Sequence, residues 1–175
     1  TSFIIEHNHI IIFGYAEGEH TLLEQLILSQ DNKQRTILIC SDSPKSQMEN
    51  DIKASVNIPK NIKILCRTID TTDPNVIKNL SIENAKAVII NTFDDDKNLR
   101  TLLAVNLLCN KNGNTDLRVV VAMKNNDYLL TEDDLHLNNL IMLQTNDTIA
   151  RVIAHTCVTS GLSSAFTEIM SINKT

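Results

Sequence analysis

The sequence is poor in aromatic residues, and this shortage limits the kind of core that it can build. Among 175 residues there is no Trp, and aromatic residues make up only 3% of the chain. Hydrophobic residues nevertheless account for 42%, which is enough for one globular domain. We therefore expect a single core built from Ile, Leu, Val and Ala side chains.

Two further absences exclude classes of partner. The chain has no run of Lys and Arg, and its formal net charge is −5. Because nucleic-acid binding depends on clustered cations and stacking aromatics, we expect no nucleic-acid partner. No apolar run approaches the roughly 20 residues of a membrane span, so we expect no direct membrane insertion. The first residue is Thr rather than Met, which suggests a piece of a larger protein.

The four cysteines include no CxxC pair and no zinc-site spacing. Each lies inside an apolar segment, which is typical of buried reduced thiols and of a reducing compartment. They are Cys40, Cys66, Cys109 and Cys157.

Short apolar runs alternate with helical patterns through the first 145 residues. Such runs are typical of parallel strands that are buried on both faces. We predict strands at 9–13, 35–40, 62–69, 85–91, 117–123 and 139–144. Repeated strand–helix units with short links predict an α/β domain over residues 1–145. Its expected fold is a Rossmann-like, doubly wound parallel six-stranded sheet in the order 3-2-1-4-5-6.

Two predicted helices have a capping residue followed by proline at their start. Ser43 precedes Pro44, and Asp73 precedes Pro74. Ser and Asp accept hydrogen bonds from the first helical N–H groups, and proline suits the first turn. We therefore predict that Ser43 and Asp73 cap the helices that follow.

Residues 146–175 follow a different pattern. Apolar positions recur at helical spacing on both sides of the break "SGL" (160–162), which predicts a helix–turn–helix. Its apolar faces need a partner. The pattern leaves open whether they pack against their own domain or against another subunit.

The first predicted strand runs into "GYAEGEH" (14–20), where a dinucleotide-binding fold has its glycine-rich phosphate loop. Gly14 is present as the turn glycine, but Ala16 and Glu19 replace the second and third glycines. A carboxylate there repels phosphate. Asp42 follows the second strand, where an acid binds the ribose. Gly14 and Asp42 are thus the candidate residues for NAD or ATP, although the two replacements argue against a nucleotide.

Acidic residues follow the first four predicted strands. They are Glu17, Glu19, Asp42, Asp70, Asp73, Asp94, Asp95 and Asp96. Ligands of open parallel sheets bind beyond the carboxyl ends of the strands, and a hard cation such as calcium prefers several carboxylate oxygens. The same acids are favourable at the N-termini of the helices that begin there. Spacing alone leaves both a metal site and simple helix capping open.

The remaining polar residues do not assemble a reaction centre. His7 and His9 alternate along the chain without a nearby third metal ligand, which favours a surface or core role. His20 and His136 are expected to be solvated. Because no nucleophile with a base, phosphate-binding P-loop or redox pair is present, we predict a protein that is not an enzyme.

Four stretches resemble a known family. "HIIIFGY", "AKAVIINTFDDDKNL" and "LRVVVAM" resemble the N-terminal lobe of RCK domains, the regulators of potassium conductance related to TrkA-N. "TIARVIAHTCVTSGLSSAFTEIMSI" (148–172) is similar to the segment that follows this lobe in the Castor and Pollux family of ion channels. The resemblance implies a regulatory domain on the cytoplasmic side of a tetrameric cation channel.

The same resemblance implies partners and ligands. RCK domains pair into a gating ring, so it implies a homo-oligomer through residues 146–172 and a pore and further regulatory lobe on the same polypeptide. In calcium-gated relatives, acids after the third and fourth strands bind calcium, and these positions fall on Asp70 and on Asp94 or Asp95. The alternative is an NAD- or ATP-sensing subunit of a potassium transporter, with the nucleotide over Gly14 and Asp42.

Overall fold

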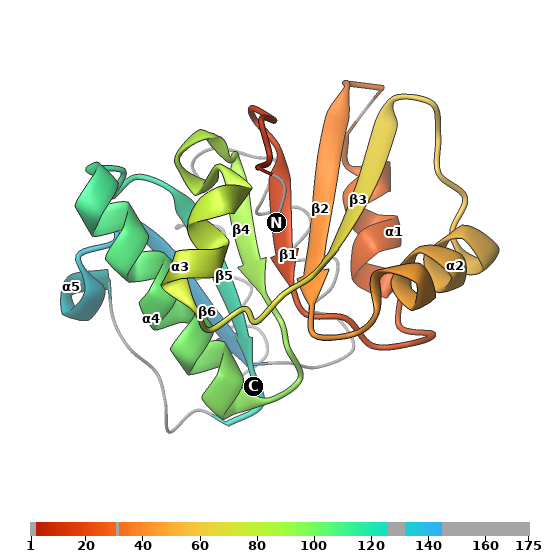
Figure 1. Cartoon of the computed structure of the whole chain (residues 1–175). Helices are drawn as coiled ribbons and strands as arrows, with labels where there is room; N and C mark the ends of the chain where they lie inside the picture. Colours follow the sequence, from red (N-terminus) through yellow and green to blue (C-terminus); the bar gives the residue numbers. More distant parts are fainter. Residues whose placement is uncertain (1–2, 31, 126–131, 145–175) are drawn as a thin grey trace, which may run out of the picture.

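The chain folds around one six-stranded sheet, and the computed structural model describes residues 3–30, 32–125 and 132–144 (Figure 1). All strands are parallel, and their order is β3-β2-β1-β4-β5-β6. The strands are β1 (Ile10–Phe13), β2 (Arg35–Ser41), β3 (Ile62–Thr68), β4 (Ala87–Ile90), β5 (Arg118–Met123) and β6 (Asn139–Gln144). The predicted Rossmann-like fold and strand order are confirmed.

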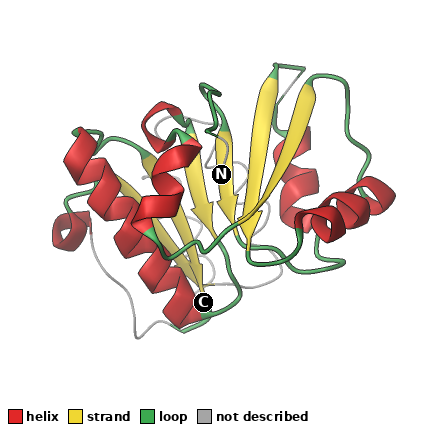
Figure 2. Cartoon of the chain, in the orientation of Figure 1, coloured by secondary structure: helices red, strands yellow, loops and turns green. Residues whose placement is uncertain are grey.

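Helices cover both faces of the sheet (Figure 2). One face packs against α1 (Thr21–Leu28) and α2 (Lys45–Ser55). The other packs against α3 (Pro74–Ile77), two short 3-10 turns (Lys78–Leu80 and Ile82–Asn84) and α4 (Asp95–Asn112). Near the β6 edge lies α5 (Glu132–Leu135). This two-faced cover explains why the strands are continuous apolar runs, because both sides of each strand are buried.

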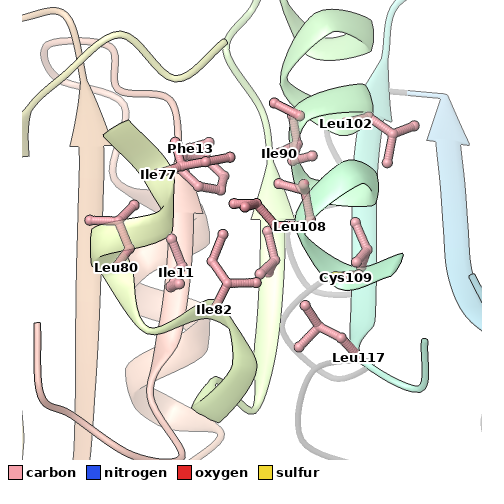
Figure 3. Close-up of a cluster of buried hydrophobic side chains, with 14 of the residues drawn as sticks. Ile11, Phe13, Ile77, Leu80, Ile82, Ile90, Leu102, Leu108, Cys109 and Leu117 are labelled. Carbon is pink, nitrogen blue, oxygen red and sulfur yellow. The ribbon is translucent and has the colours of Figure 1, made fainter. Parts of the chain in front are cut away.

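Successive residues of the central strands supply two separate cores. Phe13 and Ile90 point to the side of α3 and α4, where Leu102 packs (Figure 3). Their neighbours Ile12 and Ile89 belong to the cluster under α1 and α2. Side chains alternate across a strand with a period of two, so one short run fills both cores. Phe13 is the single aromatic residue among the fully buried side chains of the described segments, as the aliphatic composition predicts.

The two capping predictions have different outcomes. The Asp73 carboxylate accepts a hydrogen bond from the Asn75 N–H at 2.9 Å and caps α3, as predicted. The Ser43 prediction is wrong, because Pro44 occupies the cap position of α2 and no side chain caps that helix. Ser43 lies one residue too early, and its hydroxyl instead contacts the Ser41 hydroxyl at 3.3 Å.

Cys40, Cys66 and Cys109 are buried free thiols, as predicted. Cys157 and the predicted helix–turn–helix of residues 146–175 lie outside the described residues. Within the described ranges, no helix combines the length and apolarity needed to cross a bilayer.

Candidate functional site

Gly14 makes the turn at the end of β1, and the structure shows why this position requires glycine. Its N–H donates to the Cys40 carbonyl at 2.8 Å, and its φ is +126°. A Cβ at Gly14 would lie 1.8 Å from the Asn91 carbonyl oxygen, just beyond β4. The glycine is thus needed for close packing against the chain's own backbone, and a bound phosphate is not required to explain it.

A pocket opens beside this turn, between the loop after β1 and the helices of the α1–α2 face. Many of its lining side chains are aliphatic, and two are aromatic. The lining residues are Ile12, Gly14, Tyr15, Ala16, Glu19, His20, Leu22, Leu23, Ile39, Ile52, Asn91 and Phe93. The lining provides a carboxylate and an imidazole but no Lys or Arg to neutralise a phosphate.

The loop over the pocket is held to α2 by Asp51. One carboxylate oxygen, Oδ2, accepts a hydrogen bond from the Tyr15 hydroxyl at 2.5 Å and from the Gly18 N–H at 3.2 Å. The same oxygen lies 3.1 Å from His20 Nε2. The hydrogen bond from Tyr15 lowers the pKa of Asp51, while burial and Asp51 raise the pKa of Tyr15.

His20 and Asp51 were not foreseen as parts of this arrangement. The prediction that His20 is solvated is wrong, because its side chain is only 7% exposed. Asp51 lies 33 positions beyond Gly18, in a helix with a thin apolar stripe. No motif in the sequence marks this pairing, since it depends on how α2 packs beside the loop.

Asp42, the predicted ribose-binding acid, directly follows β2 and forms an ion pair with α4. Its Oδ2 lies 3.0 Å from Lys97 Nζ. Hydrogen bonding to Lys97 lowers the pKa of Asp42. The Lys97 charge also contributes to lowering the pKa of Asp70, after the larger effect of hydrogen bonds from Thr72. Lys97 is therefore a cation that pairs with Asp42 and also favours the charged form of Asp70.

The predicted metal ligands make local hydrogen bonds that stabilise turns and helix starts. Asp70 Oδ1 accepts from the Thr72 N–H at 2.9 Å and the Thr72 hydroxyl at 2.7 Å. Asp94 Oδ1 caps α4 by accepting from the Lys97 N–H at 3.0 Å. In both residues these hydrogen bonds engage Oδ1.

Asp95 is more fully engaged. Its two oxygens accept hydrogen bonds from the Lys124 N–H and the Asn125 N–H, both at 2.8 Å. These bonds tie the start of α4 to the end of β5. Across the described ranges, no three His, Cys, Asp or Glu side chains are already arranged to hold a metal ion. Calcium binding at Asp70, Asp94 and Asp95 stays a prediction.

Asn98 holds the loop after β4 in place, a role that the sequence pattern did not predict. It is 1% exposed on α4. Its Oδ1 accepts from the Thr92 N–H and hydroxyl, both at 2.7 Å, and its Nδ2 donates to the Ala122 carbonyl at 2.8 Å. These bonds hold the β4 exit, where Phe93 adopts a φ of +65°. An Asn in line with the apolar stripe of α4 was the available signal.

A doubly wound parallel sheet with its glycine turn and strand-end acids at one edge defines a Rossmann-type domain. The family model of the TrkA-N domain matches residues 10–143. The chain therefore belongs to the TrkA-N family.

Ion channels are among its curated relatives. The chain is 27% identical over 158 residues to Ion channel DMI1 of Medicago truncatula, covering 88% of this chain and 17% of the relative. It is 28% identical over 160 residues to Probable ion channel POLLUX of Arabidopsis thaliana, covering 88% and 18%. The chain thus spans less than a fifth of these relatives.

Solved structures share the fold. The GsuK RCK domain matches with a TM-score of 0.54 at 18% identity, covering 81% of this chain and 27% of that one. GsuK bound to ADP matches with the same TM-score and identity, covering 81% and 33%. The NAD(P)-binding domain of an exopolyphosphatase-related protein from Archaeoglobus fulgidus matches at 0.52 and 18%, covering 85% and 95%. At this identity these likenesses show the fold alone.

Proposed function

We propose that this domain is a non-enzymatic regulatory module on the cytoplasmic side of a cation channel, and that it senses calcium. The ion-channel relatives, which match 88% of the chain, support the channel context. Because the chain spans so little of them, the pore and any further regulatory lobe would lie elsewhere in the polypeptide. Ligand binding would bias the pore through a difference in affinity between two conformations.

The ion pair between Lys97 and Asp42 carries the calcium proposal. The carboxyl edge already holds a cation, at 3.0 Å from Asp42 and close enough to Asp70 to lower its pKa. A calcium ion, which prefers six to eight oxygen ligands, would replace the Lys97 ammonium and recruit the remaining carboxylate oxygens of Asp70 and Asp94. The site would form on binding, because Lys97 occupies it in the free domain.

Titration calorimetry and thermal unfolding with calcium test this proposal. Calcium should release or absorb heat and raise the melting temperature. Lys97→Met should bind calcium roughly ten-fold more tightly, equivalent to about 1.4 kcal/mol, because it removes the competing charge. Lys111→Met is the matched control, since it removes the same charge from the last turn of the same helix.

Replacing one of the acidic ligands should have the opposite effect on calcium affinity. Asp70→Ala and Asp94→Ala should each weaken calcium binding, whereas Asp96→Ala, at an exposed position paired with Arg100, should not. The proposal fails if calcium produces neither heat nor a melting shift in the wild type and in Lys97→Met.

The pocket beside Gly14 favours NAD or ATP as a second candidate ligand. It opens at the turn where Rossmann folds hold the pyrophosphate, and GsuK, a neighbour in fold, is described as bound to ADP. Asp42 would then bind the ribose, and Lys97 would be the nearest cation for phosphate. Lys97→Met should consequently weaken nucleotide binding, the opposite of its effect on calcium. Thermal shifts with NAD, ATP and calcium on this one variant separate the two candidates.

We further propose that residues 146–172 form the pairing interface of a homo-oligomer, as the resemblance of this segment implies. Light scattering of the whole chain should show a dimer or larger assembly, and a chain ending at residue 145 should show a smaller one. Identical masses per particle for the two chains, after allowing for the deleted residues, would exclude this segment as the interface.

A further inference from the structure

The loop between β1 and α1 collects hydrogen-bond donors in the way that a phosphate-binding loop does. The Gly18 N–H and the Tyr15 hydroxyl converge on one point, and His20 directs Nε2 toward the same point. His20 is the residue that precedes the first turn of α1. Helix N-termini and convergent N–H groups favour an anion. The geometry of an anion-binding loop therefore persists despite Ala16 and Glu19.

The anion at this point comes from the chain itself. Asp51 Oδ2, from α2, is the acceptor that both donors share, and its side chain is only 15% exposed. The hydrogen bonds keep its carboxyl charged by lowering its pKa. Asp51 thus supplies a single negative charge where a ligand phosphate would otherwise accept the loop's hydrogen bonds.

The surroundings of His20 indicate that Asp51 does not satisfy all the polar atoms that converge at this point. The His20 side chain is only 7% exposed, and its Nε2 atom lies 3.1 Å from Asp51 Oδ2. Nε2 nevertheless has no hydrogen-bond partner with suitable geometry among the described residues. A buried polar atom without an aligned partner costs free energy. An anion with more than one oxygen, such as a phosphate, would supply an acceptor for His20 as well as for Gly18.

We propose that Asp51 is an internal substitute for a phosphate, and that the loop of residues 14–20 binds a phosphate-bearing ligand only when Asp51 is displaced. The contact is autoinhibitory: α2 closes the loop in the free domain, and a ligand must release α2 to enter. This inference deepens the nucleotide candidate and rests on it, since it describes how that site is regulated. It does not depend on calcium, because Asp51 is not one of the proposed calcium ligands.

Removal of the Asp51 charge should open the site. Calorimetry with inorganic pyrophosphate as the probe should show binding to Asp51→Asn that is at least about ten-fold tighter than to the wild type, as expected when one competing charged hydrogen-bond acceptor is removed. ADP used in parallel distinguishes a nucleotide site from a site for phosphate alone, because only a nucleotide site binds ADP more tightly than pyrophosphate.

Glu19→Gln is the matched control. It removes one negative charge from the same loop and pocket lining, yet it leaves Asp51 bound to its donors. A gain in affinity equal to that of Asp51→Asn would mean that charge alone is responsible and would overturn the inference. Wild-type binding as tight as that of Asp51→Asn would also overturn it, while leaving the nucleotide candidate intact. No binding by either protein would refute both.

Asp51→Ala tests the same inference even though this variant is expected to be less stable. Loss of the Asp51 contacts should lower the melting temperature of Asp51→Ala, and pyrophosphate should restore several degrees of it, because the added anion accepts the freed hydrogen bonds. The wild type should gain much less. Equal melting shifts in the two proteins, or none in Asp51→Ala, would contradict the internal-phosphate role of Asp51.

Discussion

The Gly14 Cα faces the carbonyl of Asn91 so closely that a Cβ on Gly14 would lie 1.8 Å from that oxygen. The contact joins the end of β1 to the exit of β4, the two strands at the centre of the sheet. The Asn91 backbone is held in this position, because the Asn91 N–H donates a hydrogen bond to the Phe13 carbonyl at 2.8 Å. The turn is therefore intolerant of any side chain.

Gly14→Ala should destabilise the domain by about 2–5 kcal/mol, because it combines a strained φ with overpacking against backbone. Urea unfolding followed by circular dichroism measures this. Gly18→Ala is the control: Gly18 also has a positive φ, +77°, but a Cβ there meets nothing within 4 Å. It should cost only about 1 kcal/mol. Equal costs at the two positions would contradict the steric explanation.

Asn98→Ala should cost about 2–4 kcal/mol of unfolding free energy, because it leaves the Thr92 N–H and the Ala122 carbonyl without their partner in a buried place. Asn110→Ala, on an exposed turn of the same helix, should cost less than about 0.5 kcal/mol. Chemical denaturation of both variants provides the comparison. A small effect at Asn98 would mean that water or a shifted backbone replaces its three hydrogen bonds.

Asp95→Ala should destabilise the domain by about 1–3 kcal/mol, since two backbone N–H groups lose a charged acceptor. Its neighbour Asp96 pairs with Arg100 on the exposed surface, so Asp96→Ala should change stability by about 0.5 kcal/mol or less. Thermal unfolding without any divalent cation measures the structural role of Asp95 separately from calcium. Similar melting temperatures for the two variants would count against the link from α4 to β5.

His9 should make the domain less stable in mild acid. Burial lowers its pKa, against the opposing effect of its 2.9 Å hydrogen bond to the Leu80 carbonyl. The unfolded chain then binds a proton near the ordinary pKa of about 6.5, while the folded chain resists it. Stability from this residue is therefore fully present above that pH and declines as the pH falls toward the folded pKa.

Urea unfolding at several values between pH 8 and pH 5 tests this expectation. His9→Gln should flatten the dependence, because Gln donates to Leu80 without titrating. His7→Gln, at an exposed position, should change it much less, because His7 lowers the pKa of His9 by a smaller effect than burial does. The carboxyls with lowered pKa, such as Glu6 beside Lys63, lose their contribution only at lower pH. An unchanged slope in His9→Gln would assign the acid sensitivity to other groups.

The sequence predicts some contacts at the carboxyl edge of the sheet but not others. Asp73 caps α3 as predicted, because a cap and its helix are neighbours in the chain. Asp42 was placed correctly at the end of β2, but its ion pair with Lys97 spans 55 positions. Such a pair depends on how α4 packs beside the loop that follows β2. Local sequence patterns do not predict a contact of this kind.

The sequence by itself determined the sheet, its six strands and their order, because hydrophobic periodicity and the handedness of crossovers are properties of short, local segments. It also determined that the acids gather at one edge, since parallel strands end on the same side. Only the tertiary structure decided what each polar group contacts. The packing of α2 against the first loop brings Asp51 to Tyr15, Gly18 and His20, and the close approach of β4 explains Gly14. Both outcomes depend on contacts between segments that are far apart in the chain.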